Sequence, residues 1–267
     1  MKIRYNLFPE GKKRALTLSY DDGRDFDLRL ARLFDLYGLK GTFHLNGGKL
    51  GRDRYLSAED VRLHFARHEI SCHSLTHPHI NKIPTEELIY EMLEDRRVLE
   101  PLCGYPVRGM SYPNGIYNDA IVQALRVMGM QYSRTTVATN KFSLPEDFMQ
   151  WHPTCHHTVE NLFELLEKFR TSTRLSLPVF YVWGHSYEFD RDDNWELIER
   201  FCREAGGDPE VWYATNIEIY DYVMALRGLR FSADRTMVYN PAATDVWISV
   251  DGAPVRVAGG ATLHLNT

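Results

Sequence analysis

The sequence predicts an α/β fold in which a strand and a helix alternate about seven times. Short apolar runs alternate with amphipathic helical patterns along the chain, and polar residues stand where the runs end. Repeated strand–helix units form a parallel sheet or a barrel, whose catalytic groups collect at the carboxyl ends of the strands. A change of pattern near residue 229 predicts a separate β appendage after this unit.

The predicted strands are short apolar runs bounded by charged or turn-forming residues. They cover 14–19, 40–45, 69–73, 107–111, 130–135, 178–184 and 210–214. Polar or catalytic residue types stand at or just after the ends of six of them: Asp21-Asp22, Asn46, His73, Ser111-Tyr112-Pro113, Arg134 and His185. One face of a barrel would bring all of these together.

Helices are predicted where apolar residues recur every three or four positions. The ranges are about 30–37, 58–67, 85–102, 119–128, 159–170, 193–205 and 217–227. Capping residues support several ends, because Ser, Thr and Asn accept hydrogen bonds from the first free N–H groups. We expect Ser57, Asn118 and Thr158 to be N-caps, Gly38 to follow the first helix, and Gly206-Gly207 to end the sixth.

The tail differs in pattern from the rest of the chain. Apolar and polar residues alternate over Val246–Val250 and again over Val255–Val257, as in two strands, and Asp251-Gly252 between them is typical of a hairpin turn. A segment of this length is too short to hold a core alone, so we expect it to pack on the barrel. The expected division is 1–228 for the catalytic unit and 229–267 for the appendage.

Composition narrows the classes of function. The chain has 267 residues, 44% of them hydrophobic, and a net charge of −5, which favours neither nucleic acid nor an anionic membrane as partner. The first residues lack the apolar core of a signal peptide and no run is long enough to span a bilayer, so the expected location is cytoplasmic. The oligomeric state is left open.

The four cysteines are expected to be free thiols. They are far apart in sequence and form no Cys-x-x-Cys pair. Cys155-His156-His157 could form a metal site but lacks the ordinary spacing of metal ligands, and a structural or substrate-contacting role is expected for the two histidines.

Two short motifs carry the chemistry. Asp21 and Asp22 end one apolar run, and His73 and His77 follow another. One carboxylate and two imidazoles form a three-ligand site for a divalent metal with a position left for water, and the second carboxylate is free to act as a base. Alone, the aspartates are as typical of a turn with a helix cap, and a pair of histidines four apart is often a solvated face. Their combination favours the metal site.

With two further motifs the chain resembles a known family. Ser-Tyr-Asp-Asp-Gly at 19–23, His-Ser-Leu-Thr-His at 73–77, Tyr-Pro-Asn-Gly at 112–115 and Val-Trp-Gly-His at 182–185 occur in order. Together they resemble the polysaccharide deacetylase family, the NodB-homology domain of carbohydrate esterase family 4, over roughly residues 9–225. The resemblance implies a distorted (β/α)7 barrel and hydrolysis of an N- or O-acetyl group, usually on a sugar.

The resemblance also implies roles for individual residues. Asp22, His73 and His77 would bind the metal, typically Zn²⁺, with Co²⁺, Ni²⁺ or Mn²⁺ as alternatives. Asp21 would be the catalytic base and His185 the general acid, although a hydrogen-bonded core histidine is an alternative for His185. The backbone N–H of Asn114 would donate to the oxyanion.

The third motif departs from the family pattern. The family commonly has an Arg before x-Pro-x-Gly that pairs with the catalytic Asp, and this chain has Ser111 there. Arg134, at the end of the next predicted strand, is our candidate for the missing charge beside Asp21. Trp151 is only a loose match to the Trp of the family's fourth motif. Substrate contacts are expected from Tyr112, Pro113, Arg134, Trp151 and Trp183, with core packing as the alternative for each aromatic.

The leading expectation is a metal-dependent deacetylase of an N-acetylated amino sugar or acetylated glycan. A second is the same fold acting on a small non-sugar amide. A third is a carbohydrate-binding protein with weakened catalysis, for which Ser111 is the supporting feature; retention of Asp21 and His185 argues against it.

Overall fold

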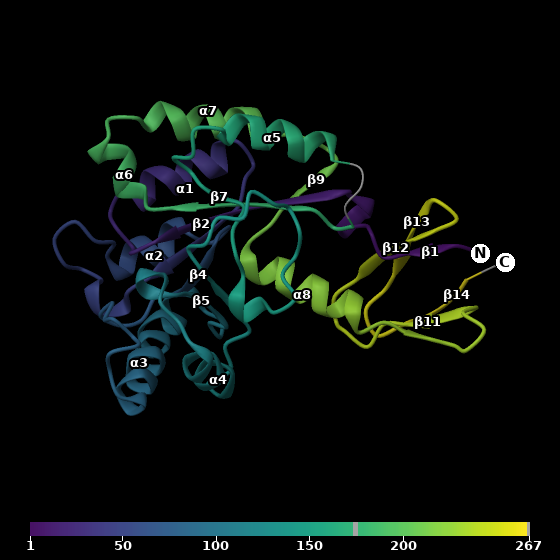
Figure 1. Ribbon diagram of the computed structural model, residues 1–267, viewed down its shortest axis with the longest axis horizontal. Coiled ribbons are helices and arrows are strands. Elements are labelled where there is room, and N and C mark those ends of the chain that lie inside the picture. The colour runs from purple at the N-terminus through teal and green to yellow at the C-terminus, as the bar shows by residue number, and fades with distance from the viewer. Residues whose placement is uncertain (173–175, 266–267) are drawn as a thin grey trace.

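A curled parallel sheet forms the centre of the molecule (Figure 1). The computed structural model describes residues 1–172 and 176–265. Within them the sheet has eight strands in the order β6-β5-β4-β3-β2-β8-β7, with β9 also paired to β2. The strands are β2 (Arg14–Asp21), β3 (Gly41–Leu45), β4 (Glu69–Cys72), β5 (Gly109–Ser111), β6 (Tyr132–Arg134), β7 (Cys155–His156), β8 (Val179–Gly184) and β9 (Val211–Tyr213).

The sheet bends round until its two edges are linked by one segment. Trp151 pairs with Arg134 of β6, and four residues later β7 pairs in parallel with β8. All ladders of this sheet are parallel, so the carboxyl ends of its strands lie at one rim. The predicted distorted α/β barrel is confirmed, with all seven predicted strands present. β7 was not predicted, because two residues are too short for a periodic pattern.

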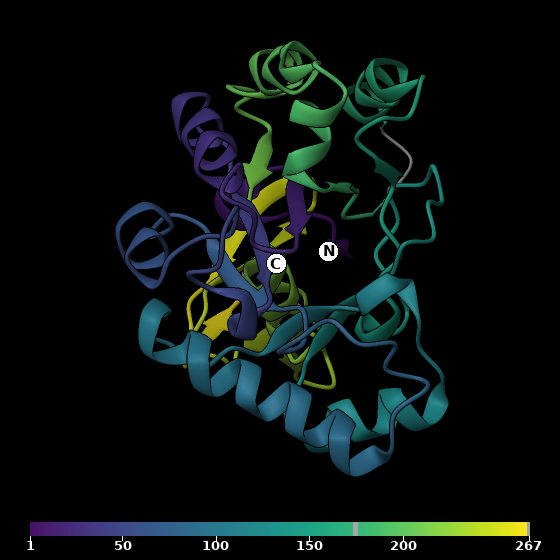
Figure 2. The ribbon, with the colours of Figure 1, turned by 90° about the vertical axis from the view of Figure 1, so that its left-hand side faces the viewer.

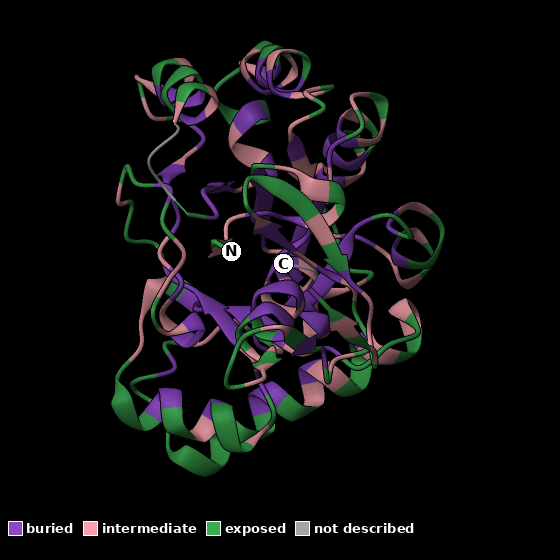
Figure 3. Ribbon diagram, turned by 90° about the vertical axis from the view of Figure 1, so that its right-hand side faces the viewer, coloured by how far each residue is buried: buried purple, intermediate pink, exposed green. Residues whose placement is uncertain are grey.

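Helices cover the outside of the sheet and bury their inner faces against it (Figures 2 and 3). They are α1 (Asp27–Leu36), α2 (Ala58–His64), α3 (Thr85–Cys103), α4 (Asp119–Val127), α5 (Leu162–Thr171), α6 (Ser186–Arg191), α7 (Trp195–Ala205) and α8 (Asn216–Arg227), with short 3₁₀ turns η1 (Pro9–Gly11), η2 (Gly47–Lys49), η3 (Pro113–Gly115) and η4 (Phe148–Gln150). Seven of the helices match the predicted ranges, and α6 is an additional one.

The predicted caps hold with one exception. Ser57 forms a capping box with Asp60, and Asn118 accepts from the N–H of Ile121. Thr158 does not cap α5, because its hydroxyl bonds to the His156 ring and the helix begins after Asn161.

The interior of the curled sheet is polar, which distinguishes it from the apolar layer under the helices. Leu16 and Leu18 of β2 pack in the same apolar cluster as residues of α1, so by alternation Thr17 and Ser19 face inward. Thr17 donates to Asn216 Oδ1 (2.8 Å), and Glu69 accepts from Thr42 (2.9 Å) and from the Tyr132 hydroxyl (2.6 Å). Burial raises the pKa of Glu69 to about 7. This bonded interior supports the rim where the site lies.

The appendage lies at one end of the molecule, beside both termini (Figure 1). It contains β10 (Arg230–Phe231), β11 (Met237–Tyr239), β12 (Val246–Val250), β13 (Ala253–Val257) and β14 (Thr262–His264). The predicted hairpin is present, with positive φ at Asp251 (50°) and Gly252 (91°). The N-terminal strand β1 (Ile3–Arg4) pairs with β12, so the start of the chain joins the appendage, which the sequence did not indicate. Among the described residues there is no helix long and apolar enough to cross a membrane.

Candidate metal centre and active site

The polar residues that the sequence placed at strand ends meet at one rim. Asp21 ends β2, Asn46 follows β3 and His73 follows β4, while Tyr112 follows β5, Arg134 ends β6 and His185 follows β8. Asp21, Asp22, His73, His77, Asn114 and His185 all line one cleft of about 320 Å³. The expected gathering at one face therefore results from the parallel topology.

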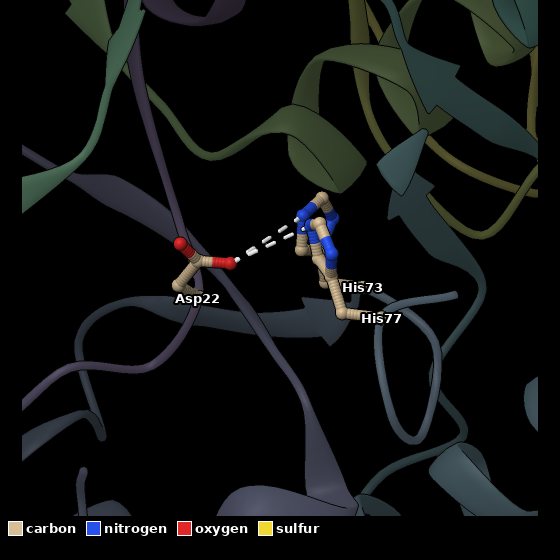
Figure 4. Close-up of side chains that lie close together, drawn as sticks. All are labelled: Asp22, His73 and His77. Carbon is tan, nitrogen blue, oxygen red and sulfur yellow. Dashed lines mark ion pairs between the residues drawn. The ribbon is translucent and has the colours of Figure 1, made fainter. Parts of the chain in front are cut away.

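Asp22, His73 and His77 lie close enough to share one ion (Figure 4). Asp22 Oδ1 is 3.8 Å from Nε2 of His73 and 3.8 Å from Nε2 of His77. Metal–ligand bonds of about 2.0–2.2 Å in tetrahedral geometry separate neighbouring ligand atoms by about 3.3–3.6 Å. The three side chains are near this spacing, so a small adjustment would seat an ion between them.

The surroundings of His73 also fit a metal ligand. Its Nδ1 lies 3.0 Å from the backbone carbonyl oxygen of Ser111. A hydrogen on Nδ1 that donates to a carbonyl leaves the lone pair on Nε2, the atom that faces Asp22. Burial lowers the pKa of His73 to about 4, which keeps the imidazole neutral at ordinary pH. The donor set, one carboxylate and two neutral imidazoles, suits a borderline divalent ion such as zinc or cobalt.

The backbone at the site adopts conformations that non-glycine residues rarely take. Asp22 (φ 82°), Ser74 (62°), His77 (67°) and Asn114 (57°) all lie in the left-handed region. Each such residue costs on the order of 1–3 kcal/mol unless its surroundings enforce it, and such residues cluster at functional sites. The turns after β2, β4 and β5 are thus held in geometries that the chain does not prefer locally.

Two buried side chains hold the His73 loop in place. Asp95, from α3, accepts from the N–H of His73 (3.1 Å) and the N–H of Gly47 (2.6 Å). Asn46 donates to the carbonyl oxygens of His73 (2.6 Å) and Ser74 (2.8 Å). Burial raises the pKa of Asp95 to about 7. The sequence marked Asn46 as a strand-end residue but not Asp95, since an aspartate inside a long helix has no distinguishing pattern.

Asp21 is held by two partners from neighbouring strands. Ser111 Oγ donates to its Oδ1 (2.9 Å), and the guanidinium of Arg134 donates to its Oδ2. Arg134 is fully buried and lies under the Trp183 ring, with 4.3 Å from its guanidinium carbon to the ring centroid. Burial alone would raise the pKa of Asp21, but Arg134 and the nearby imidazoles outweigh it and hold that pKa well below its usual range. The hypothesis that Arg134 supplies the charge beside Asp21 agrees with this contact.

His185 stands at the start of α6, within a group that the sequence did not assemble. Its Nδ1 lies 3.4 Å from Glu188 Oε2, and its backbone N–H donates to the same oxygen (3.2 Å). Burial alone would lower the pKa of His185, but Glu188 and the site aspartates outweigh it and raise that pKa. A raised pKa is what a general acid needs near neutrality. The only indication in the sequence was the i, i+3 spacing of the pair.

The residues expected to contact substrate divide into two groups. Tyr112 and Trp183 line the cleft, together with Tyr187. Trp151 does not reach it, because its ring packs at 72° against Tyr181, in the buried cluster that also contains Tyr132. Pro113 and Arg134 are also buried and outside the cleft lining, so the structure gives Arg134 a contact with Asp21 in place of a substrate contact.

Fold and site together define an α/β barrel protein with a candidate divalent-cation site at the carboxyl ends of its strands. The model of the family described as Polysaccharide deacetylase matches residues 9–133. The Bacillus subtilis (strain 168) protein named "Putative polysaccharide deacetylase YxkH" is 25% identical over 127 residues, which are 46% of this chain and 45% of that protein. This part of the chain, slightly less than half of it, is therefore similar to the polysaccharide deacetylases, a family of metal-dependent deacetylases.

Solved structures support the fold over a larger part of the chain. "Putative polysaccharide deacetylase from Mycobacterium smegmatis" aligns with a TM-score of 0.60 at 16% identity, over 85% of this chain and 96% of that one. A family 4 acetyl xylan esterase from Clostridium thermocellum, in complex with a cobalt ion, aligns with a TM-score of 0.50 at 14% identity, over 77% and 90%. The chain spans about half the length of the curated relative it matches.

Proposed function

We propose that this protein is a metal-dependent deacetylase that hydrolyses the acetyl group of an N-acetylated amino sugar or acetylated glycan. One observation carries the proposal: Asp22, His73 and His77 lie close enough together to hold one metal ion, in the same cleft as Asp21 and His185. We propose zinc as the ion. The name of the family supports the glycan substrate.

The first half of the reaction needs an activated water and a base. A divalent ion held by Asp22, His73 and His77 would lower the pKa of a water molecule and polarise the acetyl carbonyl. Asp21 lies beside the triad, with Oδ2 4.0 Å from His73 Nε2, and accepts the proton as water attacks. Ser111 and Arg134 fix the orientation of the Asp21 carboxylate while this happens.

The second half needs an oxyanion donor and an acid. Asn114 lies in the 3₁₀ turn η3 at the cleft, where its backbone N–H would donate to the developing oxyanion. His185, across the cleft from a different strand, protonates the departing amine or alkoxide. Glu188 lies beside Nδ1 of His185 and raises the pKa of the imidazole, which favours its protonated form before the transfer.

The cleft favours a small, partly apolar group next to the ion. Its volume of about 320 Å³ is at the lower end of the range of ligand pockets, and Tyr112, Trp183 and Tyr187 contribute aromatic surface. Aromatic faces of this kind pack against the apolar side of sugar rings and acetyl groups. An acetamido sugar fits both the volume and the lining.

The decisive experiment is acetate release from metal-stripped protein with and without added Zn²⁺ or Co²⁺. The panel contains N-acetylglucosamine oligomers, O-acetylated xylan oligomers, and small cyclic and linear amides. We expect metal-dependent release from an acetylated sugar, lost in Asp21→Asn and retained in His152→Asn, a histidine outside the cleft lining.

The outcomes separate the three functions weighed above. Turnover of a small amide alone would replace the glycan substrate while keeping the chemistry. No turnover of any substrate, with one ion bound and with glycan affinity unchanged in Asp21→Asn, would overturn the deacetylase proposal in favour of a binding protein.

A further inference from the structure

A second group of metal-binding side chains lies behind His185. His156 at the end of β7, His157 directly after it and Glu188 of α6 bring three ligand atoms within 4.8 Å of one another. Glu188 Oε2 is 3.2 Å from Nε2 of His156 and 3.3 Å from Nε2 of His157. These separations match the edge of a tetrahedral site with bonds of about 2.0–2.2 Å, which is about 3.3–3.6 Å. No role in the reaction proposed above falls on either histidine.

His157 is the unusual member of this group. It is 1% exposed, and neither of its ring nitrogens has a hydrogen-bond partner among the residues that the structure describes. Its Nε2 points at Glu188 Oε2 from 3.3 Å without the alignment of a hydrogen bond. A buried polar group without a partner costs about 1–3 kcal/mol, so such groups in folded proteins usually bind water or an ion. Nε2 of His157 therefore faces the position, beside Glu188 Oε2, where a bound ion or water would supply the missing partner.

The other nearby groups fit a cation at this position. His156 Nδ1 accepts from the backbone N–H of Thr158 (3.3 Å) and lies 2.8 Å from its hydroxyl, so the neutral ring carries its proton on Nε2, and a cation would displace that proton. Nδ1 of His185 is also buried without a hydrogen-bond partner in the described part of the chain, 3.4 Å from the same Glu188 oxygen. Arg191 lies 3.8 Å from the other oxygen of Glu188, which leaves Oε2 to the histidines.

Close packing holds His157 in this orientation. Its ring packs against both Phe189 (centroids 4.2 Å apart) and Tyr20 (5.7 Å), which also contact each other. Gly184 passes so close that an added Cβ would lie 1.9 Å from His157 Nδ1. These two rings and the backbone of Gly184 restrict rotation of the imidazole. The arrangement is therefore preorganised, as a metal ligand should be.

We propose that His156, His157 and Glu188 bind a second divalent cation, a borderline ion of the zinc class, separate from the ion of Asp22, His73 and His77. Two imidazoles and one carboxylate are the donors that zinc, cobalt and nickel prefer, and they leave a fourth position open. This inference concerns binding and does not depend on the deacetylase reaction.

The test is the stoichiometry of metal binding to the whole chain. Chelator-stripped protein is dialysed against buffered Zn²⁺ or Co²⁺, and bound metal is measured per chain by mass spectrometry of the element. We expect two ions in the unsubstituted protein. The double variant Asp22→Asn, His77→Asn is expected to bind one ion, at the second site. The double variant His157→Asn, Glu188→Gln is also expected to bind one ion, at the first site. The protein with all four substitutions is expected to bind none. His152→Asn, a control histidine bonded to Thr135, is expected to keep two.

A second measurement uses the unsubstituted protein, so it does not depend on the folding of variants. Crystals grown with Zn²⁺ are measured on both sides of the zinc absorption edge. An anomalous peak between His156, His157 and Glu188, besides the one at Asp22, supports the proposal. A single ion per chain at saturation, together with no peak in this cluster, would overturn it and leave Glu188 as the hydrogen-bond acceptor of the histidines.

Discussion

Arg134 and Asp21 form an ion pair across the rim of the barrel, with both side chains almost fully excluded from solvent. They come from the carboxyl ends of β6 and β2, which three other strands separate in the sheet. The guanidinium reaches the carboxylate because the curled sheet brings these ends toward each other. Ser111 of β5 completes the contact by donating to the second carboxylate oxygen.

Removing Arg134 should destabilise the fold. Arg134→Gln leaves Asp21 buried without its countercharge, and breaking one side of a buried pair costs about 3–5 kcal/mol. The measurement is urea unfolding of metal-free protein at pH 7. The matched control is Arg126→Gln, which removes an exposed pair with Asp147 and should cost less than about 1 kcal/mol.

The pH dependence of that difference follows from the sign of the Asp21 shift. A carboxyl whose pKa is lowered in the folded state contributes stability above its unfolded pKa of about 3.9, and loses it as the pH falls toward the folded pKa. The difference between wild type and Arg134→Gln should be full at pH 6–7 and shrink below about pH 4. An equal difference at pH 3 and pH 7 would contradict the ion pair.

Ser111→Ala tests how far a hydroxyl supports the metal site. Ser111 Oγ lies 2.6 Å from His73 Nδ1 and 2.9 Å from Asp21 Oδ1, so it connects a predicted ligand with the predicted base. Loss of such a supporting group typically lowers metal affinity or activity by about 10–100-fold. We expect a loss in this range for zinc, measured by competition with a chromophoric chelator. Ser133→Ala, one strand away, should leave the affinity within about twofold.

Glu188→Gln should move the alkaline limb of the pH–rate profile. The carboxylate raises the pKa of His185, and a general acid is active only while protonated, so activity falls as the pH rises through that pKa. Without the charge, burial dominates, the pKa falls and the limb moves to lower pH. The profile of kcat/KM shows this directly.

Two variants control for the second cluster and for surface charge. His157→Asn removes a proposed second-site ligand but keeps Glu188, so in protein loaded with one ion per chain at Asp22, His73 and His77 its alkaline limb should stay in place. Glu196→Gln removes an exposed carboxylate from α7 and should also leave the limb unchanged. A shift of equal size in His157→Asn would show that the cluster, and not the Glu188 charge on His185, sets the limb.

Metal removal should lower the thermal stability as well as the activity. An ion that binds only the folded state stabilises it by about 2.7 kcal/mol when its concentration is 100 times Kd. Calorimetry with and without chelator should show a lower melting temperature after stripping. In the double variant Asp22→Asn, His77→Asn most of this difference in melting temperature should vanish. If metal removal leaves the melting temperature of the wild type unchanged, tight binding is excluded.

Most helices and strands of this protein were predictable because their patterns depend on residues close together in the sequence. Alternating strand and helix patterns located all seven predicted strands, and Ser57 and Asn118 marked their helix starts by their own hydrogen bonds. β7 was missed because it is two residues long, and Thr158 was misassigned as a cap because a nearby histidine ring captures its hydroxyl. Trp151 was assigned to the cleft, but its large ring is buried against Tyr181, because burial of an apolar ring is more favourable than its exposure in the cleft.

By itself the sequence determined the barrel, the appendage hairpin and the meeting of strand-end residues at one rim, since these follow from periodicity and from the geometry of parallel strands. Only the tertiary structure decided which of those residues touch. Arg134 with Asp21, Asp95 with His73, and Glu188 with two histidines are contacts between segments 22 to 113 residues apart. Such contacts depend on how far the sheet curls and how helices pack on it, and no local pattern in the chain encodes either.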